Sequence, residues 1–285
     1  MKRLLVFAGF FSAAIAAHGQ IQVDLKFSRL QYVAYEPVLA TVTITNLAGR
    51  DVELRDDNDQ HWYGFEITAN DERTLAPLSQ ASEPPLQIAA GTSVTRKINL
   101  TPIFPITDLG VYHVRANVFF ADLNKFFYSR AKVFEVTTAR PIWQRTVGVP
   151  SKGGGDAERT FSLMTNRFPD HTSLYVRVED KDAALVYATY SLGRVIAFDE
   201  PHAEVDRDNR LHVLQCAAPR VWSYSVVGLD GRLLHHATYS QTRTSPQLRR
   251  SDDGSVAVRG GMIDVPVAPA VPAKAVPKLS DRPRG

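Results

Sequence analysis

The chain has 285 residues, of which 44% are hydrophobic and 22% are charged, and its formal net charge is +3. These fractions are ordinary for globular proteins and exclude a chain that is disordered throughout. After the first twenty residues no apolar run approaches the ~18–20 residues that a membrane-spanning helix needs, so no membrane span is expected there. At ~100–200 residues per domain, the length favours about two domains.

Residues 1–19 have the pattern of an export signal peptide. Lys2 and Arg3 form a positive start, residues 4–17 are largely apolar, and small residues precede a cut after Gly19. No cysteine directly follows the apolar stretch, which excludes a lipoprotein anchor. We therefore expect a periplasmic or secreted protein with no membrane span after cleavage. Cleavage lowers the count of Lys and Arg from 33 to 31, against 30 Asp and Glu, so a nucleic-acid partner is not expected.

Residues 20–138 contain a succession of strand patterns. Several stretches alternate apolar and polar side chains with a period of two, as half-buried strands do. The patterns cover residues 21–27, 38–44, 65–67, 94–100, 111–120 and 126–137. The last two flank a five-residue hairpin loop. Short strands at regular spacing favour a sandwich or a barrel.

One motif in this region resembles the immunoglobulin-like family. The stretch Asp108-Leu109-Gly110-Val111-Tyr112-His113-Val114 is similar to the Asp-x-Gly-x-Tyr-x-Cys stretch of those domains. The resemblance implies that the Tyr112 hydroxyl bonds to the backbone at a sandwich corner and that Trp62 is the core tryptophan. Val114 stands where the family has cysteine, so an antibody-type domain is not implied. The resemblance concerns the fold and says little about function.

The sequence changes character after residue 138. Residues 139–158 contain Arg140-Pro141, Val149-Pro150 and three consecutive glycines, a composition typical of a linker. Residues 159–261 are again rich in strand patterns, with Gly-Arg pairs at Gly193 and Gly231 and a third similar start at Gly254. This spacing resembles the hairpin repeats of β-propellers. A closed propeller needs ~4 blades, and the segment holds little more than two units.

We therefore predict an all-β protein, with an immunoglobulin-like sandwich followed by a second small antiparallel β domain. The second domain is either a small sandwich or part of an assembly completed by other chains. Residues 262–285 are rich in Pro and Ala. Dense proline disfavours helices and central strands, so we expect a disordered tail, with a partner ligand or a spacer as its functional interpretation.

The sequence contains no common catalytic motif. Ser129 and Lys132 match the Ser-x-x-Lys spacing of penicillin-recognising enzymes, but that chemistry needs a helix. In a strand, residues three apart point to opposite faces. The sequence therefore predicts no catalytic residue and no cofactor, and it leans away from an enzyme.

A metal site is not predicted either. His202, Glu204 and Asp206 would share a strand face, but residues 206–209 lack the glycine and glutamate of a calcium loop and are typical of a turn. Cys216 is the single cysteine, so it forms no internal disulfide, and we interpret it as a small buried hydrophobic residue.

Adjacent aromatic residues are the predicted binding residues. Neighbours in a strand face opposite ways, so one member of each pair should enter the core and the other should lie on the outer face. An exposed aromatic cluster would form an interaction surface unless neighbouring structure covers it. The candidates are Trp62, Tyr63, Phe119, Phe120, Phe126 and Phe127.

The sequence supports three hypotheses for function. The first is an exported, non-catalytic protein-interaction or scaffolding module, whose partner is an unknown protein or cell-envelope component. The second is a carbohydrate-binding or carbohydrate-processing accessory protein; hydrolysis would need two carboxylates ~5–10 Å apart. The third is a proteinase inhibitor that presents the loop at residues 75–90. The acids available to the second hypothesis are Glu200, Glu204, Asp206 and Asp208.

Overall fold

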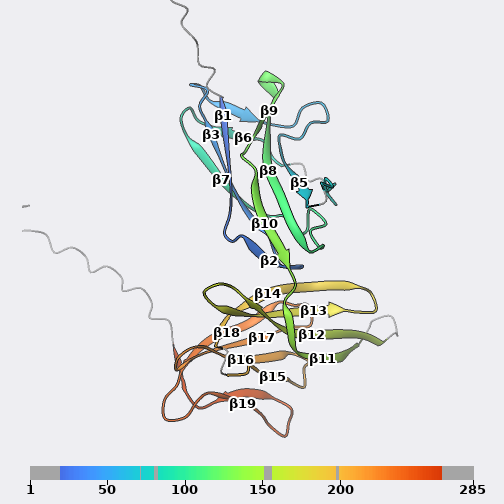
Figure 1. Ribbon diagram of the computed structural model, residues 1–285, viewed down its shortest axis with the longest axis vertical. Coiled ribbons are helices and arrows are strands. Elements are labelled where there is room, and N and C mark those ends of the chain that lie inside the picture. The colour runs from blue at the N-terminus through green and yellow to red at the C-terminus, as the bar shows by residue number, and fades with distance from the viewer. Residues whose placement is uncertain (1–19, 71, 80–82, 151–155, 197–198, 265–285) are drawn as a thin grey trace, which may run out of the picture. The chain divides into compact units, whose positions relative to one another are not determined.

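The computed structural model describes residues 20–70, 72–79, 83–150, 156–196 and 199–264 and divides the chain into two compact units, with the boundary between Thr138 and Ala139 (Figure 1). Within the described residues the elements are strands apart from one 3-10 turn, η1 (Ala121–Leu123), so the all-β prediction is confirmed. None of the helices in this described part is long and apolar enough to span a membrane. The predicted export signal at residues 1–19 lies outside the described residues.

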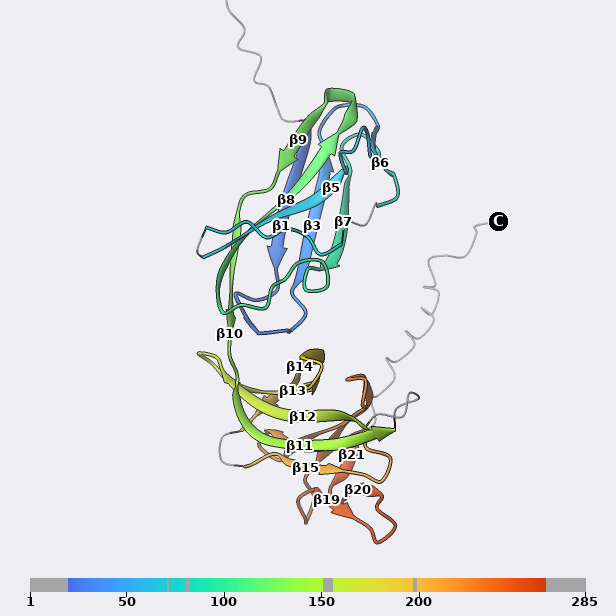
Figure 2. The ribbon, with the colours of Figure 1, turned by 90° about the vertical axis from the view of Figure 1, so that its right-hand side faces the viewer.

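The first unit consists of two larger sheets and a short two-stranded pair (Figure 2). The three-stranded sheet has the order β1 (Ile21–Phe27), β3 (Leu39–Asn46), β7 (Ser93–Asn99). The five-stranded sheet has the order β2 (Gln31–Val33), β10 (Lys132–Thr137), β8 (Gly110–Phe120), β5 (Tyr63–Ala69), and β9 (Lys125–Tyr128) also pairs with β8. The short pair is β4 (Val52–Leu54) and β6 (Leu86–Ile88). All pairs are antiparallel except β10 with β2.

The core of the first unit follows from the period-two patterns in the sequence. In β1 the apolar residues Val23 and Leu25 are buried, while the polar residues between them are exposed. They join a single cluster with residues of β8 such as Val114 and Val118. Each fully buried aliphatic side chain contributes ~1.5–3 kcal/mol to folding. Alternation of this kind lets two sheets pack face to face.

The contacts implied by the immunoglobulin-like motif are present. The Tyr112 hydroxyl donates a hydrogen bond of 2.8 Å to the carbonyl of Asp108, and its ring stacks on Phe134. Trp62 is fully buried, and its indole N–H donates to the carbonyl of Glu83 at 3.0 Å. These contacts hold the loop before β8 and the chain before β5 against the core. The immunoglobulin-like assignment itself stays a prediction.

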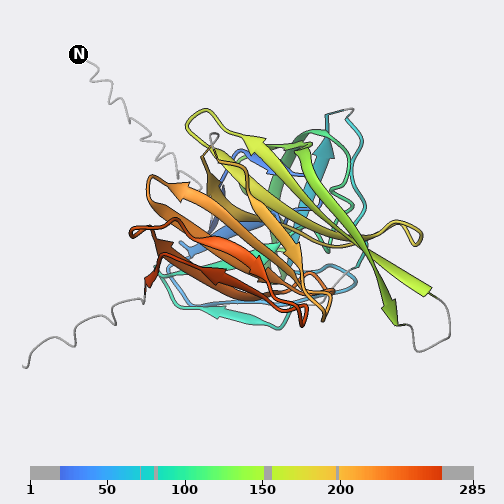
Figure 3. The ribbon, with the colours of Figure 1, turned by 90° about the horizontal axis from the view of Figure 1, so that it is seen from below.

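The second unit is built from two antiparallel sheets and a hairpin (Figure 3). The four-stranded sheet contains β11 (Arg140–Pro150), β12 (Asp156–Arg167), β13 (Thr172–Asp180) and β14 (Leu185–Val195) in chain order. The five-stranded sheet contains β15 (His202–Val205), β16 (Leu211–Ala218), β17 (Val221–Val227), β18 (Leu233–Ser240) and β21 (Met262–Asp264). The hairpin is β19 (Gln247–Arg250) with β20 (Val256–Arg259).

The five-stranded sheet of this unit buries both of its faces. Leu211 and Val213 of β16 belong to a cluster with the four-stranded sheet. Leu214 and Cys216, on the opposite face, belong to a cluster that the β19–β20 hairpin covers. Residues 211–216 are all buried, as expected for a strand that is packed on both faces. The interpretation of Cys216 as a small buried residue is therefore confirmed.

The predicted linker at 139–158 is wrong, because β11 and the start of β12 lie within it. Proline is tolerated there because β11 is the edge strand of its sheet. Pro141 adjoins a register shift and Pro150 ends the strand. Glycines 153–155 lie outside the described residues.

The propeller-type repeat is also wrong in detail, because its glycines are not equivalent. Gly231 and Gly254 lie in turns between strands, whereas Gly193 lies inside β14 at a bulge. The predicted tail at 262–285 begins with β21, which pairs with β18. Residues 265–285 lie outside the described residues.

Candidate binding cavity

The six predicted aromatic residues do not form an exposed cluster. Trp62, Tyr63, Phe119 and Phe120 are only 0%, 7%, 2% and 0% exposed, and Phe126 and Phe127 are half-buried. As predicted for neighbours in a strand, one member of each phenylalanine pair enters the core: Phe120 belongs to it and Phe127 packs against it. Of the two alternatives, burial by a strand neighbour holds for Phe119, which packs on Phe126 at 4.9 Å between ring centroids.

Two of these residues instead share a cavity in the first unit. Tyr63 and Phe126 line a cavity of about 370 Å³. The aromatic rings of Phe65 and Phe104 line it as well, as do the polar side chains of Asp59, Gln60, His61, Glu83 and Asn117. A volume of this size lies at the lower end of the ~300–1,000 Å³ that small-molecule sites occupy.

A tight turn before β5 places the polar residues of the cavity. Asp57 and Gln60 exchange two backbone hydrogen bonds, of 2.8 and 3.1 Å. Asn58 and Asp59 between them have φ values of 43° and 64°, as the central residues of a type I′ turn do. The carboxylate of Asp56 accepts a hydrogen bond from the Trp62 N–H at 2.9 Å and contacts His61 Nδ1 at 3.0 Å. The turn is therefore fixed to the start of β5.

The wall of the cavity comes from β5, which is the edge strand of its sheet. Consecutive residues Tyr63, Gly64 and Phe65 all line the cavity, so it reaches both faces of the strand. Gly64 lies opposite Asn117 of β8. A Cβ atom at Gly64 would lie 2.9 Å from the Asn117 side-chain oxygen. Glycine at this position therefore leaves room for the Asn117 amide.

Of the two acidic side chains that line the cavity, Glu83 forms an ion pair and Asp59, within the described residues, does not. Glu83 forms an ion pair of 2.6 Å with Arg96, whose guanidinium lies 5.1 Å from the Trp62 ring. Asp59 is exposed, and no side chain among the described residues pairs with its carboxylate. The cavity therefore combines aromatic rings with one unpaired negative charge. This combination suits a positively charged side chain, which aromatic faces and carboxylates both attract.

The Tyr63 hydroxyl is buried and has no hydrogen-bond partner among the described residues. Burial raises the pKa of Tyr63. A buried hydroxyl without a partner costs stability, so Tyr63 is held here by the packing of its ring, which contacts Trp62 and Phe65.

One histidine–carboxylate pair lies at the cavity. His61 and Asp56 form a pair such as catalytic triads contain, and Ser79 also lines the cavity. No hydrogen bond joins His61 to Ser79 in the described structure. Among the described residues, the His61–Asp56 pair therefore has no nucleophile in contact with it.

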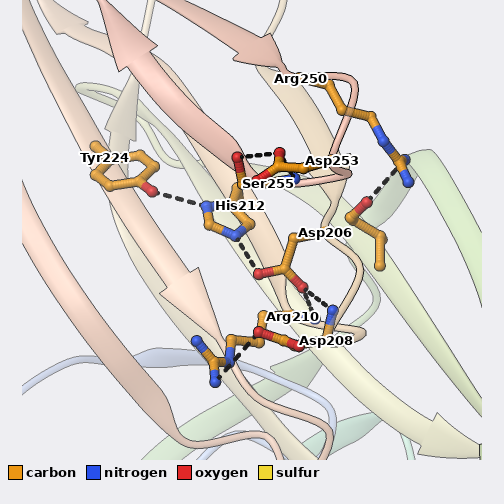
Figure 4. A network of polar contacts seen from close by, with 9 residues as sticks. Asp206, Asp208, Arg210, His212, Tyr224, Arg250, Asp253 and Ser255 are labelled. Atoms are coloured by element: carbon orange, nitrogen blue, oxygen red, sulfur yellow. Dashed lines mark hydrogen bonds and ion pairs between the residues drawn. The ribbon is translucent and has the colours of Figure 1, made fainter.

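Asp206 of the second unit lies in a network of polar contacts (Figure 4). One carboxylate oxygen of Asp206 accepts hydrogen bonds from the N–H groups of Asp208 and Arg210, at 2.9 and 2.8 Å. The other lies 3.0 Å from His212 Nε2, and His212 Nδ1 lies 2.7 Å from the Tyr224 hydroxyl. We call Asp206, His212 and Tyr224 the β16 network. All three residues are more than nine-tenths buried.

Protonation in the β16 network follows from these contacts. Burial favours a higher pKa for Asp206, but the hydrogen bonds from His212 and the two backbone N–H groups outweigh it, and the net pKa is lowered. Because an ionised carboxylate only accepts, His212 donates from Nε2. Burial, with smaller contributions from Tyr239 and from the Asp206 charge, raises the pKa of Tyr224 to about 12. The Tyr224 hydroxyl therefore stays protonated. When the His212 imidazole is neutral, this hydroxyl donates a hydrogen bond to Nδ1.

This geometry gives no support to a hydrolytic carboxylate pair, a metal site or a free inhibitor loop, and carbohydrate binding stays an untested alternative. Asp206 anchors the β15–β16 turn and is not an exposed acid of a hydrolytic pair. Among the described residues no three His, Cys, Asp or Glu side chains converge on a metal position. The loop proposed for a proteinase inhibitor is not free along its length, because Leu75 and Ile88 are buried in the core and residues 86–88 form β6.

Comparison with known proteins adds little. No protein-family model and no curated protein matches the sequence. A solved structure that is similar is the crystal structure of Spo0M, a sporulation control protein from Bacillus subtilis. It is 10% identical, the match covers 59% of this chain and 83% of that chain, and the TM-score is 0.31. A likeness this low carries no argument, so function is argued from the cavity itself.

Sequence reasoning missed most of the cavity. Asp59, Phe104 and Asn117 come from segments that no local pattern connects. One signal was available: Asn58 and Asp59 tolerate positive φ values, and a tight turn directly before a Trp-Tyr pair places polar groups beside aromatic rings.

Proposed function

We propose that the protein is an exported, non-catalytic interaction module whose first unit binds a positively charged side chain of a partner protein in the Tyr63–Phe126 cavity. The observation that carries the proposal is the unpaired Asp59 carboxylate at a cavity lined by four aromatic rings. Export rests on the signal pattern of residues 1–19. The partner is a protein or cell-envelope component that presents lysine or arginine.

The expected strength of the contact is modest for one side chain. A cation over an aromatic face contributes ~0.5–2 kcal/mol, depending on how far it is desolvated. An exposed ion pair with Asp59 adds ~0.2–1 kcal/mol. The cavity alone therefore gives selectivity between side chains, and a whole partner surface must supply the remaining affinity.

The proposal is tested by titrating the chain of residues 20–285 with N-acetyl-arginine amide. N-acetyl-citrulline amide is the matched probe, because it has nearly the same shape without the charge. We expect arginine amide to bind about tenfold more tightly, a difference of ~1.4 kcal/mol. Asp59→Asn should remove most of this preference. Equal binding of the two probes, or binding of neither, would contradict the proposal.

A further inference from the structure

A groove of about 640 Å³ runs along another side of the first unit. One wall consists of six consecutive residues of β1, Ile21–Lys26. The other wall consists of Phe127, Tyr128, Arg130 and Lys132, where β9 passes into β10. The groove shares no lining residue with the Tyr63–Phe126 cavity.

The backbone of β9 is unpaired on the side away from β8. In an antiparallel pair, residues direct their N–H and C=O groups alternately toward and away from the partner strand. Ser129 donates its N–H to the carbonyl of Ala116, and Phe127 lies opposite Val118, so these residues point toward β8. The backbone groups of Phe126 and Tyr128 therefore point the other way, and no described strand pairs with them.

The edge of β1 is unpaired in the same manner. Leu47 donates its N–H to the carbonyl of Gln20, so Gln20, Gln22 and Asp24 direct their backbone groups toward β3. The backbone groups of Ile21, Val23 and Leu25 point away from β3, and within the described chain β1 pairs with no other strand. Both walls of the groove therefore offer backbone donors and acceptors.

The side chains along the groove are predominantly positive. Lys26, Arg130 and Lys132 are exposed, and none of them forms an ion pair with a described residue. The one acid in the lining is Asp24, which accepts a hydrogen bond from Gln22 at 2.8 Å. Three cations against one anion make the groove complementary to a negatively charged ligand.

We propose that this groove binds an extended acidic segment of a partner protein, which adds as a strand to the free edge of β9. Backbone groups of Phe126 and Tyr128 pair with the segment, and Lys26, Arg130 and Lys132 contact its carboxylates. Main-chain pairing supplies affinity in such strand addition, and side-chain contacts supply specificity. This is a second binding surface beyond the proposed function of the cavity; Phe126 takes part in both, with its side chain at the cavity and its backbone at the free edge of β9. Cations along an edge strand can also serve to prevent aggregation. The experiment below distinguishes this protective role from binding of an acidic segment.

The probe is an acetylated and amidated eight-residue peptide of alternating glutamate and valine, with a lysine-and-valine peptide as its match. Fluorescence anisotropy with the chain of residues 20–285 should show the acidic peptide binding at least about tenfold more tightly. The double variant Arg130→Glu with Lys132→Glu should reverse this preference. Failure of the acidic peptide to bind, or equal binding of both peptides, would overturn the proposal.

Strand addition is separated from simple charge attraction by N-methylation of the acidic peptide. Methylating alternate amides leaves the charge unchanged and removes hydrogen-bond donors on one edge of the peptide. One of the two alternate sets should weaken binding about tenfold and the other should have little effect. If both methylated peptides bind as tightly as the parent, strand addition is wrong.

Asp59→Asn, which alters only the cavity, should leave peptide binding unchanged, so failure of the groove proposal is distinct from failure of the cavity proposal.

Discussion

The Tyr63–Phe126 cavity and the β16 network contain two buried tyrosines in opposite situations. The Tyr224 hydroxyl lies 2.7 Å from His212, whose other nitrogen contacts the anchored carboxylate of Asp206. The Tyr63 hydroxyl has no partner among the described residues, and the neighbouring Asp59 carboxylate is exposed and unpaired. A polar network whose members are satisfied stabilises a fold. The comparison therefore indicates a structural role for Asp206 of the second unit and agrees with the proposed binding role of Asp59 in the first unit.

The largest expected effect comes from removing the carboxylate of the β16 network. Asp206→Ala leaves two backbone N–H groups and His212 without their acceptor, and we expect a loss of about 3–5 kcal/mol in the free energy of unfolding. Asp208→Ala is the matched control, because Asp208 is exposed and lies 3.6 Å from Arg210. The control should change stability by less than about 0.5 kcal/mol. Chemical denaturation measures both, and similar losses would contradict the structural assignment.

The two tyrosines should respond differently to loss of the hydroxyl. Tyr224→Phe leaves His212 Nδ1 unpaired in the interior, so it should cost about 1–3 kcal/mol. Tyr63→Phe removes a buried hydroxyl that lacks a partner, so stability should stay the same or rise. Urea unfolding of the two variants compares them directly. A clear loss of stability in Tyr63→Phe would show that its hydroxyl has a partner in solution.

A control within the first unit sharpens that comparison. Tyr112 is buried like Tyr63, at 1% against 7% exposed, but its hydroxyl donates to the Asp108 carbonyl at 2.8 Å. Tyr112→Phe should cost about 0.5–1.5 kcal/mol, the net contribution of one hydrogen bond. If Tyr112→Phe and Tyr63→Phe behave alike, the structure does not discriminate the two hydroxyls.

The pH dependence of stability should report the same network. The pKa of Asp206 is lower in the folded chain than its ordinary value. Its ionised form therefore stabilises the fold above about pH 4, the unfolded value, and this contribution is lost as the pH falls through the folded pKa. Asp206→Asn should remove that part of the acid sensitivity. Thermal unfolding between neutral pH and pH 2 measures this sensitivity in both proteins. If the variant loses stability in acid as much as the parent does, the interpretation is wrong.

Much of the fold can be predicted from local sequence, because apolar and polar side chains alternate along a half-buried strand with a period of two residues. Residues 21–27 form β1 as predicted, and the hydroxyl contact of Tyr112 follows from a short motif. β11 was missed because its prolines indicate a linker until the strand is known to lie at a sheet edge. The cavity was missed because Asp59, Asn117 and Phe126 meet only through the pairing of β8 with β5 and β9. Pairing between distant strands is not contained in any local pattern.

The most direct test of the binding role is to locate a bound cation at atomic resolution. In an NMR experiment on residues 20–285 with N-acetyl-arginine amide, we predict nuclear Overhauser contacts between the ligand's side-chain methylenes and the ring protons of Phe126 and Phe104. Their loss in Phe126→Leu, with the fold retained, would assign them to the cavity. Contacts confined to other surfaces, or none at saturating ligand, would contradict the account.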